Sequence, residues 1–257
     1  MHPSQHSPSQ SKNTAVVIFA KYPKAGYSKT RLTKSTVPEL GPITPEQSAE
    51  LYHAFLQDYI HRFQQEVLDC ETFFCVRPGP DFSLFEQTYA TSNIQVVEEP
   101  THQGQRAADI GQAMSFTIRH FLTLGYQKVI ILGSDLPHFP TEIIREAQKK
   151  LDAAPLVLGN DGGGCYLVSA SEPPTLFEQG LIVWSQGEDF ATICRLQKER
   201  GKEVGVLERE LQDIDTPEDL HKLILQLQME TSLQKDIPHT SQILHHWGWL
   251  KSDTSQK

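Results

Sequence analysis

The sequence predicts an α/β protein in which helices cover both faces of a mostly parallel β-sheet, giving a three-layer sandwich. Short, continuously apolar runs recur along the chain, and such runs are typical of strands that are buried on both faces of a sheet. Helical patterns separate several of these runs. Strand and helix alternate over about 210 residues without an evident linker, so we expect one domain.

The first predicted elements are a strand at 14–20 and a long helix that begins near Pro45. Thr44 and Gln47 have the spacing of a capping box, and Pro45 occupies the first helical position, where its missing N–H is tolerated. Apolar residues then recur every four positions, which predicts one buried face. That face comprises Leu51, Phe55, Tyr59 and Phe63. Strands are expected next at 71–76 and 94–99.

The second half of the chain continues this alternation. A helix is predicted at 107–124, a strand at 128–133 and a further helix at 141–152. The runs 155–159 and 165–169 are separated by a glycine-rich turn, so they predict one hairpin in an otherwise parallel sheet. The last predicted helices are 188–200 and one that starts near Pro217.

These elements place the domain at residues 14–230. Residues 1–13 are polar, and we expect a disordered tail there, because the apolar run behind them is too short for a secretory signal. Residues 231–257 are predicted to be a polar tail, in which the stretch HHWGWL either docks on the domain or stays free.

The composition disfavours several classes of function. The chain of 257 residues carries a formal charge of −9, whereas binding to a nucleic-acid polymer draws on many spread basic contacts. No apolar run approaches the roughly 20 residues that cross a bilayer. The four cysteines contain no CxxC pair, which suits reduced thiols in a cytoplasmic protein.

A basic loop follows the first strand in the stretch AKYPKAGYSKTRL, residues 20–32. It gathers Lys21, Lys29 and Arg31 around Gly26 without a carboxylate, although the chain is acidic overall. Ligands of open α/β sheets bind beyond the carboxyl ends of the strands, and a glycine there lets backbone N–H groups form an anion-binding nest. The loop therefore predicts a site for a diphosphate, with a solvated basic surface as the alternative.

Three aspartates are candidate metal ligands. Asp135 lies just past the predicted strand 128–133, at the same sheet edge as the basic loop if the two strands are parallel. Asp213 and Asp215 alternate in an extended segment and should point the same way. The alternative for Asp135 is an ordinary turn before Pro137. Helix capping explains the residues after Asp215 but leaves the two aspartates themselves unexplained.

Two further loops are candidates for contact with a ligand. The turn from Asp161 to Gly164 contains three glycines, which supply positive φ angles in a hairpin or expose backbone to a substrate. Gln103 and Gly104 lie in a loop that either faces the ligand or is ordinary surface. No Ser-His-Asp or Cys-His constellation is evident, so a nucleophilic triad is not expected.

Six motifs in order resemble one bacterial family. They are FAKYPKAGYSKTRL, QG followed by IGQAM, LGSDLPHFP, LGNDGGGCYLV, LFEQGLIVWS and DIDTPEDL. Together they are similar to the GT-A-type transferases known as selenodomain- or radical-SAM-associated transferases, over residues 14–225. That family is placed in the nucleotide-diphospho-sugar transferase superfamily. The resemblance implies a GT-A fold, a Rossmann-like sandwich that binds a nucleotide and Mg²⁺ or Mn²⁺.

The resemblance also implies roles for individual residues. Asp135 takes the place of a metal-binding aspartate, Asp215 with Asp213 completes the metal site, and the loop at Asp161 faces the acceptor. Asp135 and Asp161 are therefore the candidate catalytic residues. The residues expected to hold the nucleotide are Lys21, Gly26, Lys29, Thr30, Arg31, Gln103 and Gly104.

The expected function is metal-dependent glycosyl transfer from a nucleotide-diphospho-sugar to a small-molecule acceptor. One alternative is a nucleotidyltransferase that takes an NTP and a sugar acid or phospho-acid, because DIDTPEDL is also similar to a segment of sugar-acid cytidylyltransferases. The other is a catalytically degenerate nucleotide-binding module. Two departures from the family motivate it: Ala113 stands where an Arg is usual, and the glycine loop reads DGGGCYLV.

Overall fold

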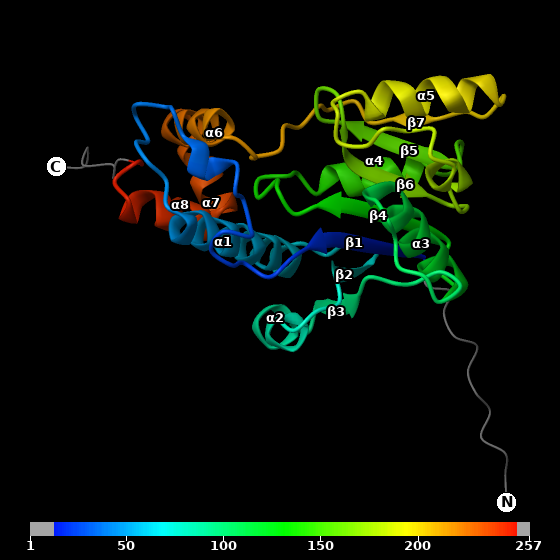
Figure 1. Ribbon diagram of the computed structural model, residues 1–257, viewed down its shortest axis with the longest axis horizontal. Helices are drawn as coiled ribbons and strands as arrows, with labels where there is room; N and C mark the ends of the chain where they lie inside the picture. Colours follow the sequence, from blue (N-terminus) through cyan, green and yellow to red (C-terminus); the bar gives the residue numbers. More distant parts are fainter. Residues whose placement is uncertain (1–12, 251–257) are drawn as a thin grey trace, which may run out of the picture.

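Seven β-strands form one sheet in the computed structural model, which describes residues 13–250 (Figure 1). The strands are β1 (Thr14–Ala20), β2 (Glu71–Val76), β3 (Ile94–Glu98), β4 (Lys128–Gly133), β5 (Leu156–Asn160), β6 (Cys165–Ala170) and β7 (Gly205–Val206). Their order across the sheet is β3-β2-β1-β4-β6-β5-β7. Only β6 runs antiparallel to its neighbours, so the mostly parallel sheet and the β5–β6 hairpin are confirmed.

Helices connect most of these strands. They are α1 (Pro45–Gln65), α2 (Phe82–Tyr89), α3 (Ile110–Thr123), α4 (Glu142–Lys150), α5 (Asp189–Glu199), α6 (Pro217–Met229), α7 (Thr231–Asp236) and α8 (Pro238–His246), with short 3₁₀ helices at Leu32–Lys34 and Thr175–Glu178. The capping box of α1 forms as predicted: the Gln47 N–H donates to Thr44 Oγ1 at 3.1 Å, and the Thr44 N–H donates to Gln47 Oε1 at 3.0 Å. The sequence analysis missed α2 and β7, which are short.

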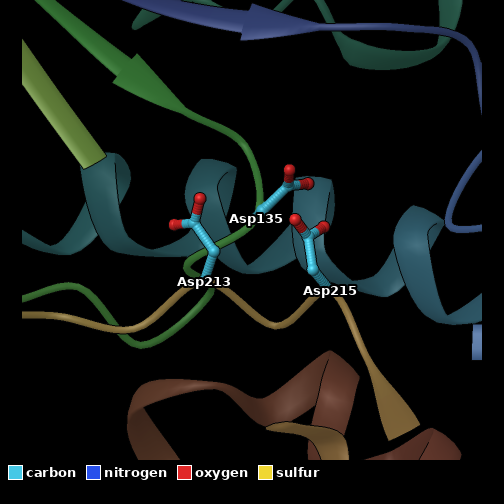
Figure 2. Close-up of side chains that lie close together, drawn as sticks. All are labelled: Asp135, Asp213 and Asp215. Atoms are coloured by element: carbon cyan, nitrogen blue, oxygen red, sulfur yellow. The ribbon is translucent and has the colours of Figure 1, made fainter. Parts of the chain in front are cut away.

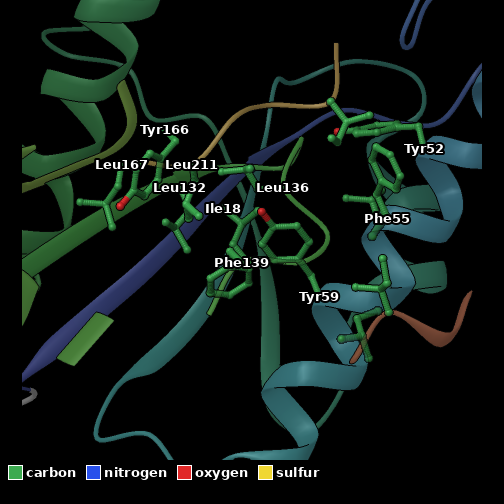
Figure 3. Packing of buried hydrophobic residues seen from close by; sticks show 14 of the residues in the cluster. Ile18, Tyr52, Phe55, Tyr59, Leu132, Leu136, Phe139, Tyr166, Leu167 and Leu211 are labelled. Carbon is green, nitrogen blue, oxygen red and sulfur yellow. The ribbon is translucent and has the colours of Figure 1, made fainter. Parts of the chain in front are cut away.

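The two faces of the sheet are covered by different helices. Alternate residues of β1 face opposite ways, so Val16 and Ile18 belong to one hydrophobic cluster, and Ala15 and Val17 to the other. Buried residues of α1, α2, α4, α6 and α8 also belong to the first cluster, part of which Figure 3 shows. Residues of α3 and α5 complete the second cluster. This arrangement is the expected three-layer sandwich.

The segment after α6 belongs to the fold rather than forming a tail, as far as it is described. Ile237, Leu244 and Leu250 are at most 2% exposed and join the cluster that contains α1. Trp247 and Trp249 pack against the same cluster, so HHWGWL docks on the domain. The domain therefore extends past residue 230 to residue 250. The sequence predicted a polar tail here because the apolar residues of this segment are few and widely spaced, so its composition does not indicate a helix with a buried face. The predicted N-terminal tail lies outside the described residues except for residue 13.

Two further observations concern the whole described chain. Cys70, Cys75, Cys165 and Cys194 are free thiols. Within residues 13–250, no helix combines the length and the apolar character that crossing a membrane requires.

Candidate active site

The basic loop leaves the carboxyl end of β1 and is fixed by its own turns and by α1. Gly26 and Lys29 have φ angles of 73° and 50°, so both lie in the left-handed region, which glycine adopts readily and lysine rarely does. The Ser48 hydroxyl of α1 lies 2.9 Å from the Ser28 carbonyl oxygen and 2.7 Å from that of Lys29. The strained conformation of Lys29 is therefore held by tertiary contacts.

This conformation turns the Lys29 side chain inward. Its side chain is 2% exposed, and Nζ lies 2.7 Å from Asp135 Oδ1 and 3.0 Å from Asp215 Oδ1. Nζ also donates to the Ile214 carbonyl oxygen at 2.7 Å. The exposed Arg31 places Nη2 2.7 Å from Asp215 Oδ2. Two of the predicted basic residues thus contact carboxylates from two other segments of the chain.

Asp135, Asp213 and Asp215 come together as a carboxylate triad (Figure 2). One carboxylate oxygen of each lies within 4.8 Å of those of the other two. Asp135 follows β4, and the Ile214 N–H donates to its backbone carbonyl at 2.9 Å, which aligns the segment before α6 with the β4 loop. Asp213 and Asp215 point toward Asp135 from that segment, as residues two apart in an extended chain do.

The three carboxylates differ in their electrostatic surroundings. Burial by itself would raise the pKa of Asp215, but Lys29 and Arg31 outweigh it and hold that pKa below its ordinary value. Burial and the Asp135 carboxylate raise the pKa of Asp213 to about 8, despite the attraction of Lys29. Asp213 Oδ1 is buried and has no hydrogen-bond partner. In the triad, both oxygens of Asp215 are therefore paired with basic side chains, whereas Asp213 forms no ion pair.

Two cavities lie on the side of the basic loop. The basic cavity, of about 360 Å³, lies between the basic loop and the segment after β2. The residues lining it include Lys21, Tyr22, Lys24, Gly26, Tyr27, Arg77, Asp81 and Phe82. The strand-end cavity, of about 320 Å³, lies over the ends of β1 and β4. Its lining includes Phe19, Lys21, Tyr52, Ser134, Asp135 and Tyr166. Lys21 thus borders both cavities.

Tyr52 of α1 ties the two strand ends together at the strand-end cavity. Its hydroxyl lies 2.7 Å from Ser134 Oγ and accepts from the Lys21 N–H at 3.2 Å. Burial, reinforced by the Asp135 carboxylate, raises the pKa of Tyr52 far above its ordinary value. The phenol therefore stays neutral and serves to position the loops after β1 and β4.

A third cavity, the acidic cavity, has all three triad carboxylates in its lining and a volume of about 380 Å³. Its polar lining consists mainly of Arg31, Asp135, Asp161, Ser185, Asp189, Asp213 and Asp215. Its apolar lining comprises Ile110, Met114, Cys165 and Trp184. The predicted residue Asp161 faces this cavity, and burial raises its pKa.

The glycine turn beside Asp161 differs from the prediction in one respect. Only Gly162 has a positive φ, of 99°. Gly163 and Gly164 are needed for space, since a Cβ at Gly163 would lie 2.4 Å from the Gly187 carbonyl oxygen and one at Gly164 would lie 2.9 Å from Asp161 Oδ2. The Gly164 N–H donates to Asp161 Oδ1 at 2.6 Å. The glycines therefore position Asp161 as well as forming the turn.

Some predicted residues do not join these cavities. Gln103 and Gly104 have φ angles of 51° and 76° and form an exposed turn that is closed by hydrogen bonds between His102 and Gln105. Thr30 is exposed, and its carbonyl accepts from the Thr33 hydroxyl. None of the three residues lines the basic, strand-end or acidic cavity. Ala113, at the position where the similar family usually has an Arg, is 3% exposed and lines none of these cavities either.

The sequence analysis missed Asp189, Trp184 and Tyr52. Asp189 is the first residue of α5, where an acidic residue is ordinary because it favours the helix N-terminus. Trp184 lies in a connection without periodicity, and Tyr52 follows directly after a residue of the buried face that the sequence predicts for α1. Only the tertiary arrangement reveals that these side chains border the site.

Comparison with known proteins gives one family match. The model of a family described as an uncharacterized protein conserved in bacteria (DUF2064) matches residues 62–186, just under half of the chain. The matched part contains Asp135, Asp161 and Trp184, but neither the basic loop nor the segment with Asp213 and Asp215. No curated protein sequence matches the chain.

Several solved structures share the fold. A proposed nucleotide-diphospho-sugar transferase from Desulfovibrio desulfuricans G20 superposes with a TM-score of 0.73 at 22% identity, over 91% of this chain and 97% of that one. A cytidylyltransferase from Leptospira borgpetersenii gives a TM-score of 0.51 at 12% identity, over 95% and 99%. A nucleotidyl transferase from Methanothermobacter thermautotrophicus gives 0.51 at 15% identity, over 82% and 95%. The chain therefore has the GT-A-like fold of such enzymes.

Proposed function

We propose that this protein is a metal-dependent transferase that takes a nucleotide-diphospho-sugar as donor. The observation that supports this most directly is the carboxylate triad at the carboxyl end of the sheet, which contacts Lys29 and Arg31 of the basic loop and lines the acidic cavity. The narrower membership among selenodomain- or radical-SAM-associated transferases stays a prediction from the motifs.

The triad fits a divalent cation by its donor atoms. Carboxylate oxygens are the ligands that Mg²⁺ and Mn²⁺ prefer, and Asp135, Asp213 and Asp215 each bring one within 4.8 Å of the others. The unpartnered Asp213 Oδ1 is a buried acceptor that such an ion would satisfy. When bound, the ion would neutralise negative charge that develops on a diphosphate leaving group.

The donor would lie on the side of the basic loop. Lys21 borders both cavities there, and Lys24 and Arg77 add positive charge at the basic cavity. Tyr22 and Tyr27 offer aromatic surfaces against which a base can stack. Lys29 already lies against the triad, where its ammonium group would meet the phosphates of a donor.

Asp161 is the candidate general base on the acceptor side. Its Oδ1 accepts from the Gly164 N–H, which leaves Oδ2 to take the proton of an acceptor hydroxyl. In the proposed reaction the acceptor oxygen forms a bond to the sugar carbon, the bond from that carbon to the diphosphate oxygen breaks, and the nucleoside diphosphate leaves. Because burial raises the pKa of Asp161, its carboxylate is a stronger base than that of an ordinary aspartate.

Nucleotidyl transfer with release of pyrophosphate is the second candidate, because two structures with this fold are nucleotidyltransferases. The test is a set of thermal shifts with NDP-sugars, NDPs and NTPs, with and without Mn²⁺. At about 100 Kd, a ligand should stabilise the chain by roughly 2.7 kcal/mol, or about 5–10 °C at this size. A shift with one NDP-sugar supports glycosyl transfer, whereas an NTP preference with pyrophosphate release supports the alternative.

Asp135→Ala should abolish the Mn²⁺-dependent part of that shift without unfolding the chain. Asp69→Ala removes the same charge from an exposed residue next to the amino end of β2 and is the matched control. If Asp135→Ala keeps the full Mn²⁺-dependent shift, Asp135 is not a metal ligand. A nucleotide-dependent shift without turnover of any donor supports the degenerate module instead. If no nucleotide shifts the wild-type melting temperature, the basic loop is a solvated surface and all three nucleotide-dependent functions are rejected.

A further inference from the structure

The acidic cavity contains two carboxylates that the metal triad does not explain. Asp161 and Asp189 line it beside the triad, and no Lys, Arg or His among residues 13–250 forms an ion pair with either. Arg31, the one basic residue in the lining, lies 2.7 Å from Asp215. Even when a divalent cation and Lys29 neutralise the triad, the outer part of the cavity therefore stays negative.

Asp189 is the less satisfied of the two. The residue is 8% exposed, and its Oδ2 accepts from the Ser185 N–H at 2.9 Å. Its Oδ1 is buried without any hydrogen-bond partner. A buried carboxylate oxygen that lacks a donor is costly, so its presence in the lining of a cavity points to a ligand that brings the donor.

An apolar wall faces these carboxylates. It consists of Ile110, Met114 and the indole ring of Trp184. The ring is held in place by edge contact with Phe177, at 5.1 Å between ring centroids. Gly111 makes room for the indole, because a Cβ there would lie 2.2 Å from it. The wall thus has the fixed Trp184 ring as its aromatic part and the Ile110 and Met114 side chains as its aliphatic part, of which Ile110 is 41% exposed.

We propose that the acceptor carries a protonated amine, bound by Asp189, and an apolar portion that lies against Trp184. This inference rests on the proposed transferase function and names the chemical class of its acceptor. A cation satisfies the free Asp189 oxygen and balances the charge, and an indole face also attracts a cation. The protonated nitrogen is a recognition group, so a hydroxyl elsewhere on the acceptor is the nucleophile.

The same charges disfavour anionic acceptors. A phosphate or carboxylate in this cavity would share it with Asp161 and Asp189 without a free basic partner, so repulsion between like charges would weaken its binding. The acceptors of the alternative nucleotidyl transfer, a sugar acid or a phospho-acid, are anions. The cavity therefore favours glycosyl transfer to an amine-bearing molecule.

The test compares three probes of nearly equal size: phenethylamine, phenethyl alcohol and hydrocinnamate. Their dissociation constants are measured by ligand-observed NMR titration of the full chain in MgCl₂ without nucleotide. The amine should bind at least about tenfold more tightly than the alcohol, the difference that one charge-assisted hydrogen bond makes. Hydrocinnamate should bind more weakly still. Equal binding of all three, or tighter binding of hydrocinnamate, would overturn the proposal.

Two variants locate the effect. Asp189→Asn removes the charge with little change of shape and should erase most of the preference for the amine. Glu188→Gln removes the same charge one residue earlier, on an exposed side chain that does not line the cavity, and should keep the preference. If both variants behave alike, the preference is general electrostatics and the assignment to Asp189 fails.

These measurements are independent of the nucleotide test. A nucleotide-dependent thermal shift without amine selectivity would remove only the acceptor class. Amine selectivity that depends on Asp189, together with no response to any nucleotide, would support the amine site and reject the transferase.

Discussion

Lys29 is a residue whose conformation and charge are both unusual. Its backbone is left-handed, and its ammonium group is buried between Asp135 and Asp215. Removing a cation from a buried ion pair destabilises a protein because the remaining charges lose their partner. Lys29 thus links the basic loop to the triad in the absence of any ligand.

Lys29→Met should lower the free energy of unfolding of the metal-free protein by about 2 kcal/mol. The loss is smaller than the roughly 3–5 kcal/mol of a fully buried pair, because the Asp135 and Asp215 side chains are 32% and 24% exposed. Urea denaturation measures this loss. MgCl₂ should restore part of it, since a cation in the triad replaces the missing charge.

Lys24→Met is the control in the same loop. The Lys24 side chain is 60% exposed, so the change should stay within about 0.5 kcal/mol. Equal effects of the two substitutions would show that Lys29 contributes no more than a surface charge.

Residues near strand ends were the predictable part of the site. Asp135 and the basic loop follow strands that their apolar runs reveal, so a parallel sheet brings them to one edge. Asp213 and Asp215 were found because capping left them unexplained. Asp189 could not be found, since the N-terminus of a helix explains an acidic residue equally well. Trp184 lies within the motif LFEQGLIVWS, but nothing in that motif indicates a role for the indole.

Helix α8 relies on a side chain of α1 to accept the hydrogen bonds of its first-turn N–H groups. Helix α8 has no capping side chain of its own. Asp58, in the middle of α1, accepts from the His239 N–H at 2.8 Å and from the Thr240 N–H at 2.9 Å. A buried carboxylate from a distant helix thus satisfies N–H groups that the first turn leaves free.

Asp58→Ala should lower the free energy of unfolding by about 2 kcal/mol, because two hydrogen bonds to a charged acceptor are lost. Hydrogen exchange should show faster exchange of the α8 amides in particular. Glu50→Ala, an exposed change on the same helix, should leave that exchange unchanged. Unaltered α8 protection in Asp58→Ala would mean that apolar packing alone holds the helix.

Strands and helices were predictable where an apolar run or a repeating apolar pattern extends over most of the element. The six apolar runs and the capped helix at Pro45 correspond to strands and to α1 with small shifts at the ends. By contrast, α7 and α8 were hidden because Ile237, Leu244 and Leu250 are separated by polar residues, so their contribution is visible only once α1 is beside them.

A partly buried histidine, His138, makes the free energy of unfolding of the whole molecule depend on pH. His138 follows the β4 loop, and burial, together with the charge of Arg62, lowers its pKa to about 4. An unfolded histidine titrates near 6.5. Because the folded pKa is the lower one, the stabilisation is complete above about pH 6.5 and is lost as pH falls toward 4.

The free energy of unfolding should therefore decrease by up to about 3 kcal/mol across this window through His138 alone. Denaturation at a series of pH values measures the slope. His138→Gln should reduce the slope by close to one proton, whereas His246→Gln, at an exposed position, should not change it. An unchanged slope in His138→Gln would show that His138 is not the titrating group.

The contact between Lys29 and Asp215 spans 186 residues of sequence. A ribosome that adds about 5–20 residues per second needs roughly 10–40 s to make the second partner after the first. Asp135 is made within that interval, so one of the two carboxylate partners of Lys29 exists before the other. The carboxylate triad is complete only once residues 213–215 have been synthesised, and a chain that stops before Asp213 retains the Lys29–Asp135 ion pair alone.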